Sequence, residues 1–113
     1  MLVQDVRGRF DSEGEFDVFA SEDLDGRATI GWIADQPWFE GPLGLWGASY
    51  LAYAQWAGAP DAPSFLRAIM PQIGGSRVQP IFYPDGVFNL DLALPYSIFL
   101  EEQNTIPGAS FLN

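Results

Sequence analysis

Residues 44–52 read GLWGASYLA, and this stretch decides the fold. It begins as a short apolar strand, turns sharply at a serine and continues as a helix. That order is typical of a nucleophile elbow, in which the turn exposes a serine hydroxyl at the top of a sheet. Gly47, Ala48 and Ala52 are small, so the strand and the helix can approach each other closely. The pattern predicts that Ser49 is the nucleophile of an acyl-transfer enzyme.

The composition restricts the function classes that remain open. The chain has 113 residues, of which 48% are hydrophobic, so it can form one small core. Its formal net charge of −10 disfavours binding to nucleic acid or to an anionic membrane surface. The chain contains no cysteine and no histidine, which excludes a disulfide framework, the usual zinc sites and a complete serine-histidine-acid triad. We predict no cofactor and no metal.

The N-terminal residues and the apolar segments bear on location. The first residues, MLVQDVRGR, lack the long apolar core of a signal peptide. No apolar run reaches the roughly 20 residues that cross a bilayer. We therefore expect no membrane association and favour a cytoplasmic location.

Strands and helices are predicted to alternate along most of the chain. Strands are expected at residues 2–6, 43–46 and 65–70, and helices from about residue 21 to 36 and over 50–58. This βαβαβ order predicts an α/β fold with three parallel strands and right-handed crossovers. The residues that face the core in the first helix are predicted to include Ile30 and Ile33.

The sequence pattern changes after residue 76, where prolines and scattered aromatic residues replace the alternation of predicted strands and helices. Residues 88–100 are predicted to form a helix that is interrupted or kinked at Pro95. We therefore predict a partial α/β core over residues 1–76 and the start of a helical region over residues 77–113.

Several motifs occur in a constant order: QDVRGRFDSEG at residues 4–14, DG at 25–26, QPW at 36–38 and GASYL at 47–51. Together they resemble the X-Pro dipeptidyl-peptidase and cocaine-esterase-like family of α/β-hydrolases. The resemblance implies an α/β-hydrolase core with a helical cap domain, and usually a C-terminal jelly-roll domain. Residues 77–113 would then be the start of the cap.

The resemblance also implies roles for individual residues. Ser49 matches the nucleophile, and the backbone N–H of Tyr50 would be one donor of the oxyanion hole. Phe82 and Tyr96 lie near positions at which family members place aromatic residues of the substrate pocket. The substrate of the intact protein would be a small acyl ester or a peptide with proline in second position. The family usually has a glycine where this chain has Ala52, and we expect the extra methyl to be tolerated at some cost in fit.

Parts of the family's machinery have no counterpart in these residues. The missing parts are the tyrosine that completes the oxyanion hole and the acidic and histidine members of the triad. We therefore expect a central fragment of a serine hydrolase that is inactive alone and self-associates through unpaired strand edges. The alternative is a non-catalytic structural or interaction module, or a degenerate remnant of such an enzyme.

Overall fold

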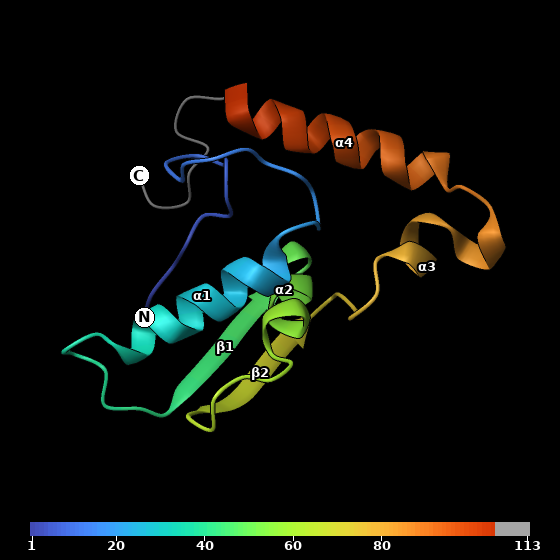
Figure 1. Cartoon of the computed structure of the whole chain (residues 1–113). Helices are drawn as coiled ribbons and strands as arrows, with labels where there is room; N and C mark the ends of the chain where they lie inside the picture. Colours follow the sequence, from blue (N-terminus) through green and yellow to red (C-terminus); the bar gives the residue numbers. More distant parts are fainter. Residues whose placement is uncertain (106–113) are drawn as a thin grey trace. The chain divides into compact units, whose positions relative to one another are not determined.

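The structure is a computed structural model that describes residues 1–105, and it divides into two compact units (Figure 1). We call Asp17–Arg77 the elbow unit. The other unit, the terminal unit, is formed by Met1–Phe16 together with the chain from Val78 onward. The division into a core over residues 1–76 and a cap over residues 77–113 stays a prediction.

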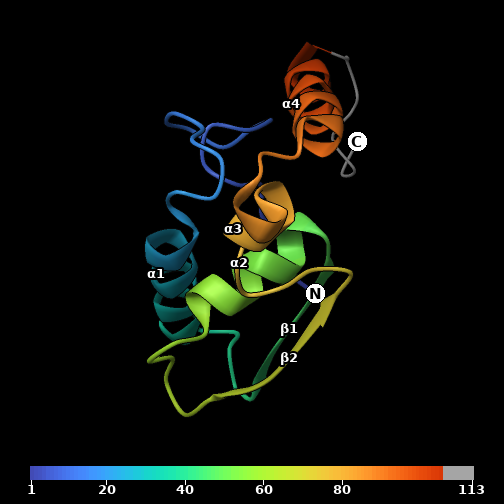
Figure 2. The same cartoon turned by 90° about the vertical axis from the view of Figure 1, so that its right-hand side faces the viewer.

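The elbow unit is built from two helices and two parallel strands. They are α1 (Glu22–Ala34), β1 (Leu43–Ala48), α2 (Tyr50–Gly58) and β2 (Leu66–Gln72). β1 and β2 pair in parallel, and Trp46 lies beside Met70 in the register. Figure 2 shows both helices on the same face of the sheet, with α2 between the sheet and α1. This arrangement is α/β, as predicted.

The interior of the elbow unit is narrow because small and branched residues line it. Ile30 and Ile33 of α1 are buried, as predicted, and Ala52 of α2 is completely buried. α1 and α2 approach each other at Gly26 and Gly58, where a Cβ added to Gly26 would lie 3.0 Å from the Gly58 Cα. The absence of side chains at this crossing lets the two helices lie close together.

The predicted number of strands is not confirmed. Residues 2–6 form no strand, and the described residues contain a two-stranded sheet. A strand is stable only where a neighbouring strand takes its hydrogen bonds, and an apolar run alone does not supply one. Leu2 and Val3 accordingly remain about half exposed. β2 runs beyond Pro71 to Gln72, because a proline removes one donor while the Gln72 carbonyl still accepts a bond from the Ser49 N–H at 2.9 Å.

The terminal unit is helical after residue 78. It contains α3 (Gln79–Phe82), the 3-10 helix η1 (Pro84–Gly86) and α4 (Leu90–Thr105). Pro95 does not interrupt α4, which continues through it. Pro95 is the sixth of the 16 residues of α4, so it removes one donor from the ladder and leaves the others in place. Two residues further on, the Ser97 hydroxyl donates to the Ala93 carbonyl at 2.8 Å.

Arg9 fastens the N-terminal loop to α4 within the terminal unit. Its guanidinium donates to the Leu100 carbonyl at 2.6 Å and to the Gln103 Oε1 at 2.9 Å. It also lies 4.9 Å from the centroid of the Phe16 ring. Arg9 is almost fully buried, so these contacts replace the water that its charge would otherwise hold.

None of the described helices is both long and apolar enough to cross a membrane.

Candidate active site

The turn between β1 and α2 holds Ser49 in an unusual backbone conformation. Its φ is 57° and its ψ is −118°, in a region that residues other than glycine rarely adopt. Ser49 follows the last residue of β1, precedes the first residue of α2 and is exposed. A sharp strand-to-helix turn with an exposed serine is compatible with the predicted nucleophile elbow. Strain of this kind is concentrated at functional sites.

The backbone of Ser49 is fixed on both sides of the turn. Its N–H donates to the Gln72 carbonyl of β2 at 2.9 Å. Its carbonyl accepts from the N–H groups of Ala52 at 3.0 Å and Tyr53 at 3.3 Å, which closes the first turn of α2. The turn therefore sets the direction in which the serine side chain leaves the backbone.

Small residues surround the turn because no space is left for larger ones. A Cβ on Gly47 would lie 2.5 Å from the Leu51 Cβ. A Cβ on Gly74 would lie 2.8 Å from the Ala52 Cβ and 2.9 Å from the Ser49 carbonyl oxygen. Real Cβ atoms do not approach so closely, so glycine is required at both positions unless the neighbours move. The methyl group of Ala52 occupies the space beside Gly74.

The amide side chain of Gln55 ties α2 to both strands. Its Nε2 donates to the carbonyls of Gly47 at 3.1 Å and Leu51 at 3.0 Å. Its Oε1 accepts from the Met70 N–H of β2 at 3.0 Å. Gln55 is buried, and these bonds use both of its amide donors and one acceptor. The helix after the serine is therefore held to the sheet by polar contacts as well as by packing.

The side chain of Tyr50 is anchored away from the sheet, at the start of α1. Its hydroxyl donates to the Glu22 Oε1 and accepts from the Phe19 N–H at 3.2 Å. The Phe19 and Tyr50 rings stack, with centroids 4.7 Å apart. Glu22 is buried, and its Oε2 accepts from the Ser21 N–H at 3.1 Å. We call Phe19, Glu22 and Tyr50 the tyrosine anchor.

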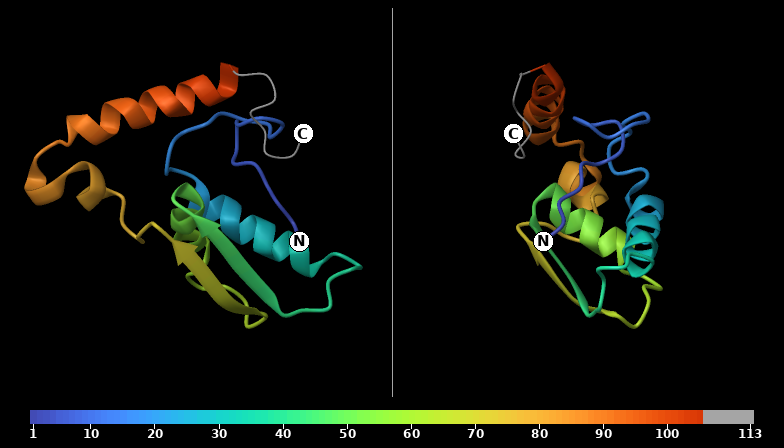
Figure 3. Two further views of the ribbon diagram at one scale, coloured as in Figure 1. Left: turned by 180° about the vertical axis from the view of Figure 1, so that it is seen from behind. Right: turned by 90° about the vertical axis from the view of Figure 1, so that its left-hand side faces the viewer.

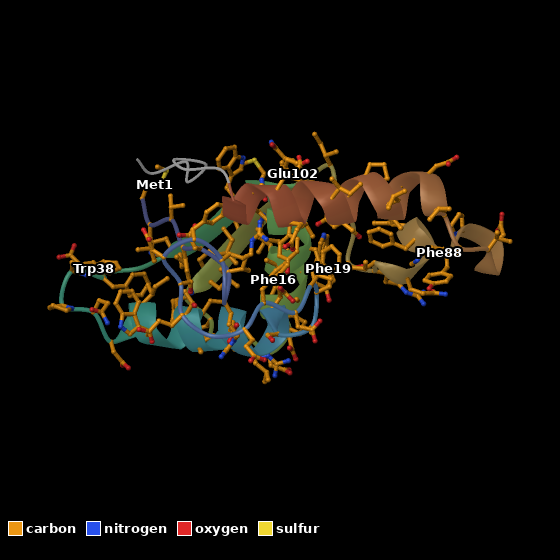
Figure 4. The ribbon with its side chains drawn as sticks, turned by 90° about the horizontal axis from the view of Figure 1, so that it is seen from above. Met1, Phe16, Phe19, Trp38, Phe88 and Glu102 are labelled. Carbon is orange, nitrogen blue, oxygen red and sulfur yellow. The ribbon has the colours of Figure 1, made fainter. Side chains whose placement is uncertain are left out.

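Tyr53 lies one helical turn after Tyr50 and contacts the same phenylalanine. Its ring meets Phe19 edge-on, with centroids 5.0 Å apart, and its hydroxyl donates to the Phe19 carbonyl at 3.3 Å. Burial, followed by the negative charges of Glu22 and Asp23, raises the pKa of Tyr53 above its usual value. The Tyr53 hydroxyl therefore stays protonated as a donor at neutral pH. Figure 4 shows that Phe19 lies at the end of α1 opposite to Trp38.

The predicted pocket residues belong to the terminal unit. The Phe82 and Tyr96 rings contact each other, with centroids 5.7 Å apart and planes inclined by 51°. Their role in binding substrate stays a prediction. In the part of the chain that the structure describes, no group of three or more acidic, histidine or cysteine side chains could hold a metal ion.

Sequence reasoning missed most of the supporting contacts around Ser49. Sequence analysis gave Glu22 no role, because an acid at the start of a helix usually only complements the helix dipole. The contacts of Phe19 and Gly74 could not be predicted from the sequence, because their partners are distant along the chain. The small residues around the serine were the one local sign of close packing.

Comparison with known proteins identifies the family to which the sequence belongs. Residues 1–108 match the family model of X-Pro dipeptidyl-peptidases of the S15 family. The chain is 33% identical over 102 residues to a cocaine esterase from Rhodococcus sp. (strain MB1 Bresler). The matched region covers 88% of this chain and 18% of that esterase. The chain thus spans about a fifth of the length of its relative, and by sequence it belongs to the X-Pro dipeptidyl-peptidase (S15) family of hydrolases.

Proposed function

We propose that this chain carries the nucleophile of a serine hydrolase and that Ser49 is that nucleophile. The backbone geometry of Ser49 is the observation that carries the proposal. Other non-glycine residues of the chain also have a positive φ, but Ser49 combines φ 57° with ψ −118° at the junction of a strand and a helix, as a nucleophile elbow requires. Membership of the hydrolase family and the exposure of Ser49 support it.

The reaction follows from acyl-transfer chemistry. The Ser49 Oγ attacks the carbonyl carbon of an ester or amide, and its proton passes to a base. The tetrahedral intermediate collapses, the bond to the alcohol or amine breaks, and the leaving group takes up that proton. Water then hydrolyses the acyl-serine ester and regenerates the hydroxyl. The backbone N–H of Tyr50 would donate to the oxyanion, a contact worth about 10²–10³ in kcat in comparable enzymes.

The proton acceptor in this proposal is supplied by another part of the protein. The 113 residues contain no histidine, which is the base that a serine nucleophile usually needs. Substrates would be small acyl esters or peptides with proline in second position. The chain by itself would bind neither nucleic acid nor a membrane surface, since its net charge is −10.

The natural polypeptide that contains this chain provides the test. Hydrolysis of p-nitrophenyl acetate and of a dipeptide p-nitroanilide with proline in second position is measured for the wild type and for Ser49→Ala. The proposal expects kcat to fall by about 10⁴-fold or more in the variant for whichever substrate is cleaved. Ser76→Ala, in the loop after β2, serves as a control because the proposal gives Ser76 no role.

The alternative function is a non-catalytic structural or interaction module. The absence of histidine from the chain is the observation that favours it. Hydrolysis that survives unchanged in Ser49→Ala, or a wild-type polypeptide that cleaves neither class of substrate, would support the module and contradict the proposal.

A further inference from the structure

We infer that Glu22 is a positioning residue for the reaction proposed above, and that it acts through the Tyr50 hydroxyl. The inference rests on the proposed role of Ser49. It adds a second element of the elbow unit to the machinery, because Glu22 lies in α1 whereas Ser49 lies between β1 and α2.

The first step of the argument is the burial of a carboxyl group. The exposed fraction of Glu22 is 6%, which is unusual for a residue at the start of a helix that could extend into water. Both of its oxygens are used, one by the Tyr50 hydroxyl and one by the Ser21 N–H. A buried carboxyl is costly unless it is bonded in this way, so the two hydrogen bonds hold Glu22 in this position.

The second step is the place of Tyr50 in the chain. It is the first residue of α2 and directly follows Ser49. Its N–H belongs to the peptide group that links it to Ser49, so any rotation of that group moves both the candidate oxyanion donor and the Ser49 carbonyl. Fixing the Tyr50 side chain restricts this rotation from the side opposite to the sheet.

The third step is the strain at Ser49. A residue at φ 57° and ψ −118° keeps this conformation only when its surroundings determine it. On the sheet side, the Gln72 carbonyl holds the Ser49 N–H at 2.9 Å. On the helix side, the tyrosine anchor holds the next residue, with the stacked Phe19 ring and the Phe19 N–H completing it. The turn is thus fixed at both ends.

Two variants of Glu22 separate the hydrogen bond from the charge. Glu22→Ala removes the partner of the Tyr50 hydroxyl. Glu22→Gln keeps one, because a tyrosine hydroxyl can donate to the amide oxygen or accept from the amide nitrogen. In the natural polypeptide we expect kcat to fall about tenfold or more in Glu22→Ala at unchanged KM, since a small misplacement of reacting groups is costly. In Glu22→Gln we expect kcat to recover most of that loss.

A double-mutant cycle tests whether Glu22 acts through Tyr50. Tyr50→Phe removes the hydroxyl but keeps the ring that stacks on Phe19. If both residues act through one bond, the combined variant Glu22→Ala plus Tyr50→Phe loses no more kcat than Tyr50→Phe alone. Independent, additive losses would overturn the inference.

Two controls distinguish positioning from general destabilisation. Tyr53→Phe removes a hydroxyl from the same helix and the same phenylalanine, but leaves the bond between Tyr50 and Glu22 intact. Ile33→Val shortens a buried side chain of α1 and should lower the melting temperature without touching Tyr50. We expect kcat within about twofold of wild type for both controls.

The outcomes are separable from those of the proposed function. Loss of turnover in Ser49→Ala with wild-type kcat in Glu22→Ala would overturn the inference and leave the nucleophile in place. A fall in kcat that Ile33→Val reproduces at an equal loss of melting temperature would also overturn it. If Glu22→Ala does not fold, kcat is compared between Glu22→Gln, which keeps a partner for the Tyr50 hydroxyl, and Tyr50→Phe, which removes that hydroxyl. A fall in kcat confined to Tyr50→Phe supports the inference, and equal kcat in the two variants overturns it. Wild-type turnover in Ser49→Ala would contradict the proposed function and the inference with it.

Discussion

The two faces of the β1–β2 sheet differ in how closely their side chains are packed. The inner face, which α2 covers, has Gly47 in contact with Leu51 and Gln55 bonded to both strands. Side chains alternate between the faces of a strand, so Trp46 and Met70 lie on the outer face, where they are 67% and 56% exposed. Figure 3 shows this outer face in its left view, with the strands in front of α2. The same six-residue strand is thus closely constrained on one side and open on the other.

The difference shows at which positions around Ser49 the available space restricts the residue type. On the inner face a single methyl group has no room at position 47, and the same holds at position 74 in the loop after β2. On the outer face a large indole lies exposed without disturbing the pairing of the strands. Substitutions on the two faces should therefore have effects of different size.

The largest difference in stability between substitutions on the two faces is expected for Gly47→Ala. The new Cβ would lie 2.5 Å from the Leu51 Cβ, so α2 must shift away from β1. We expect a loss of about 1–3 kcal/mol in the free energy of unfolding, measured by guanidinium denaturation of the natural polypeptide. Gly44→Ala is the matched control on the same strand, because the nearest atom to its Cβ would be the Ala68 carbonyl oxygen at 3.9 Å. Equal losses in the two variants would show that the faces do not differ.

A smaller effect is expected for Gly74→Ala, which tests the contact with α2. Its Cβ would meet the Ala52 Cβ at 2.8 Å and the Ser49 carbonyl oxygen at 2.9 Å. We expect a loss of about 1–2 kcal/mol in the free energy of unfolding. Adding Ala52→Gly should restore part of it, because that change removes one of the two clashes. A double variant no more stable than Gly74→Ala would mean that Ala52 and Gly74 do not share this space.

The smallest effect on stability is expected on the outer face. Trp46→Thr keeps a residue that suits a strand and removes an exposed indole, so the free energy of unfolding should change by no more than about 0.5 kcal/mol. The same variant should reduce self-association of the 113-residue polypeptide, because exposed apolar patches promote it. Light scattering measures the association state. A destabilisation as large as that of Gly47→Ala would contradict the difference between the faces.

Local signals in the sequence were sufficient to predict the strand, turn and helix around Ser49. The run from β1 through Ser49 into α2 was predicted because the strand, the small residues and the helix are contiguous. The helical face of α1 with Ile30 and Ile33 followed from its periodicity. Each of these features depends on neighbours within a few residues.

Features that depend on distant partners could not be predicted in the same way. Residues 2–6 have the composition of a strand, but pairing depends on a neighbouring strand that composition does not reveal. Pro95 indicated a helix that is interrupted or kinked. The structure has one helix through Pro95, because a single lost donor does not end a long helix, and the kink stays a prediction. The tyrosine anchor joins Glu22 to Tyr50 across 28 positions, and nothing local marks that pair. The need for glycine at position 74 similarly follows only from the closeness of Ala52 and Ser49.

Covalent labelling of the natural polypeptide tests the identity of the nucleophile most directly. A fluorophosphonate reacts with an activated serine and leaves a stable phosphonyl group on its oxygen, and mass spectrometry of the digested protein locates that group. Our account predicts a stoichiometric adduct on Ser49, with loss of hydrolysis in proportion to labelling and no adduct in Ser49→Ala. An adduct on another residue, or full hydrolysis with Ser49 unlabelled, would contradict it.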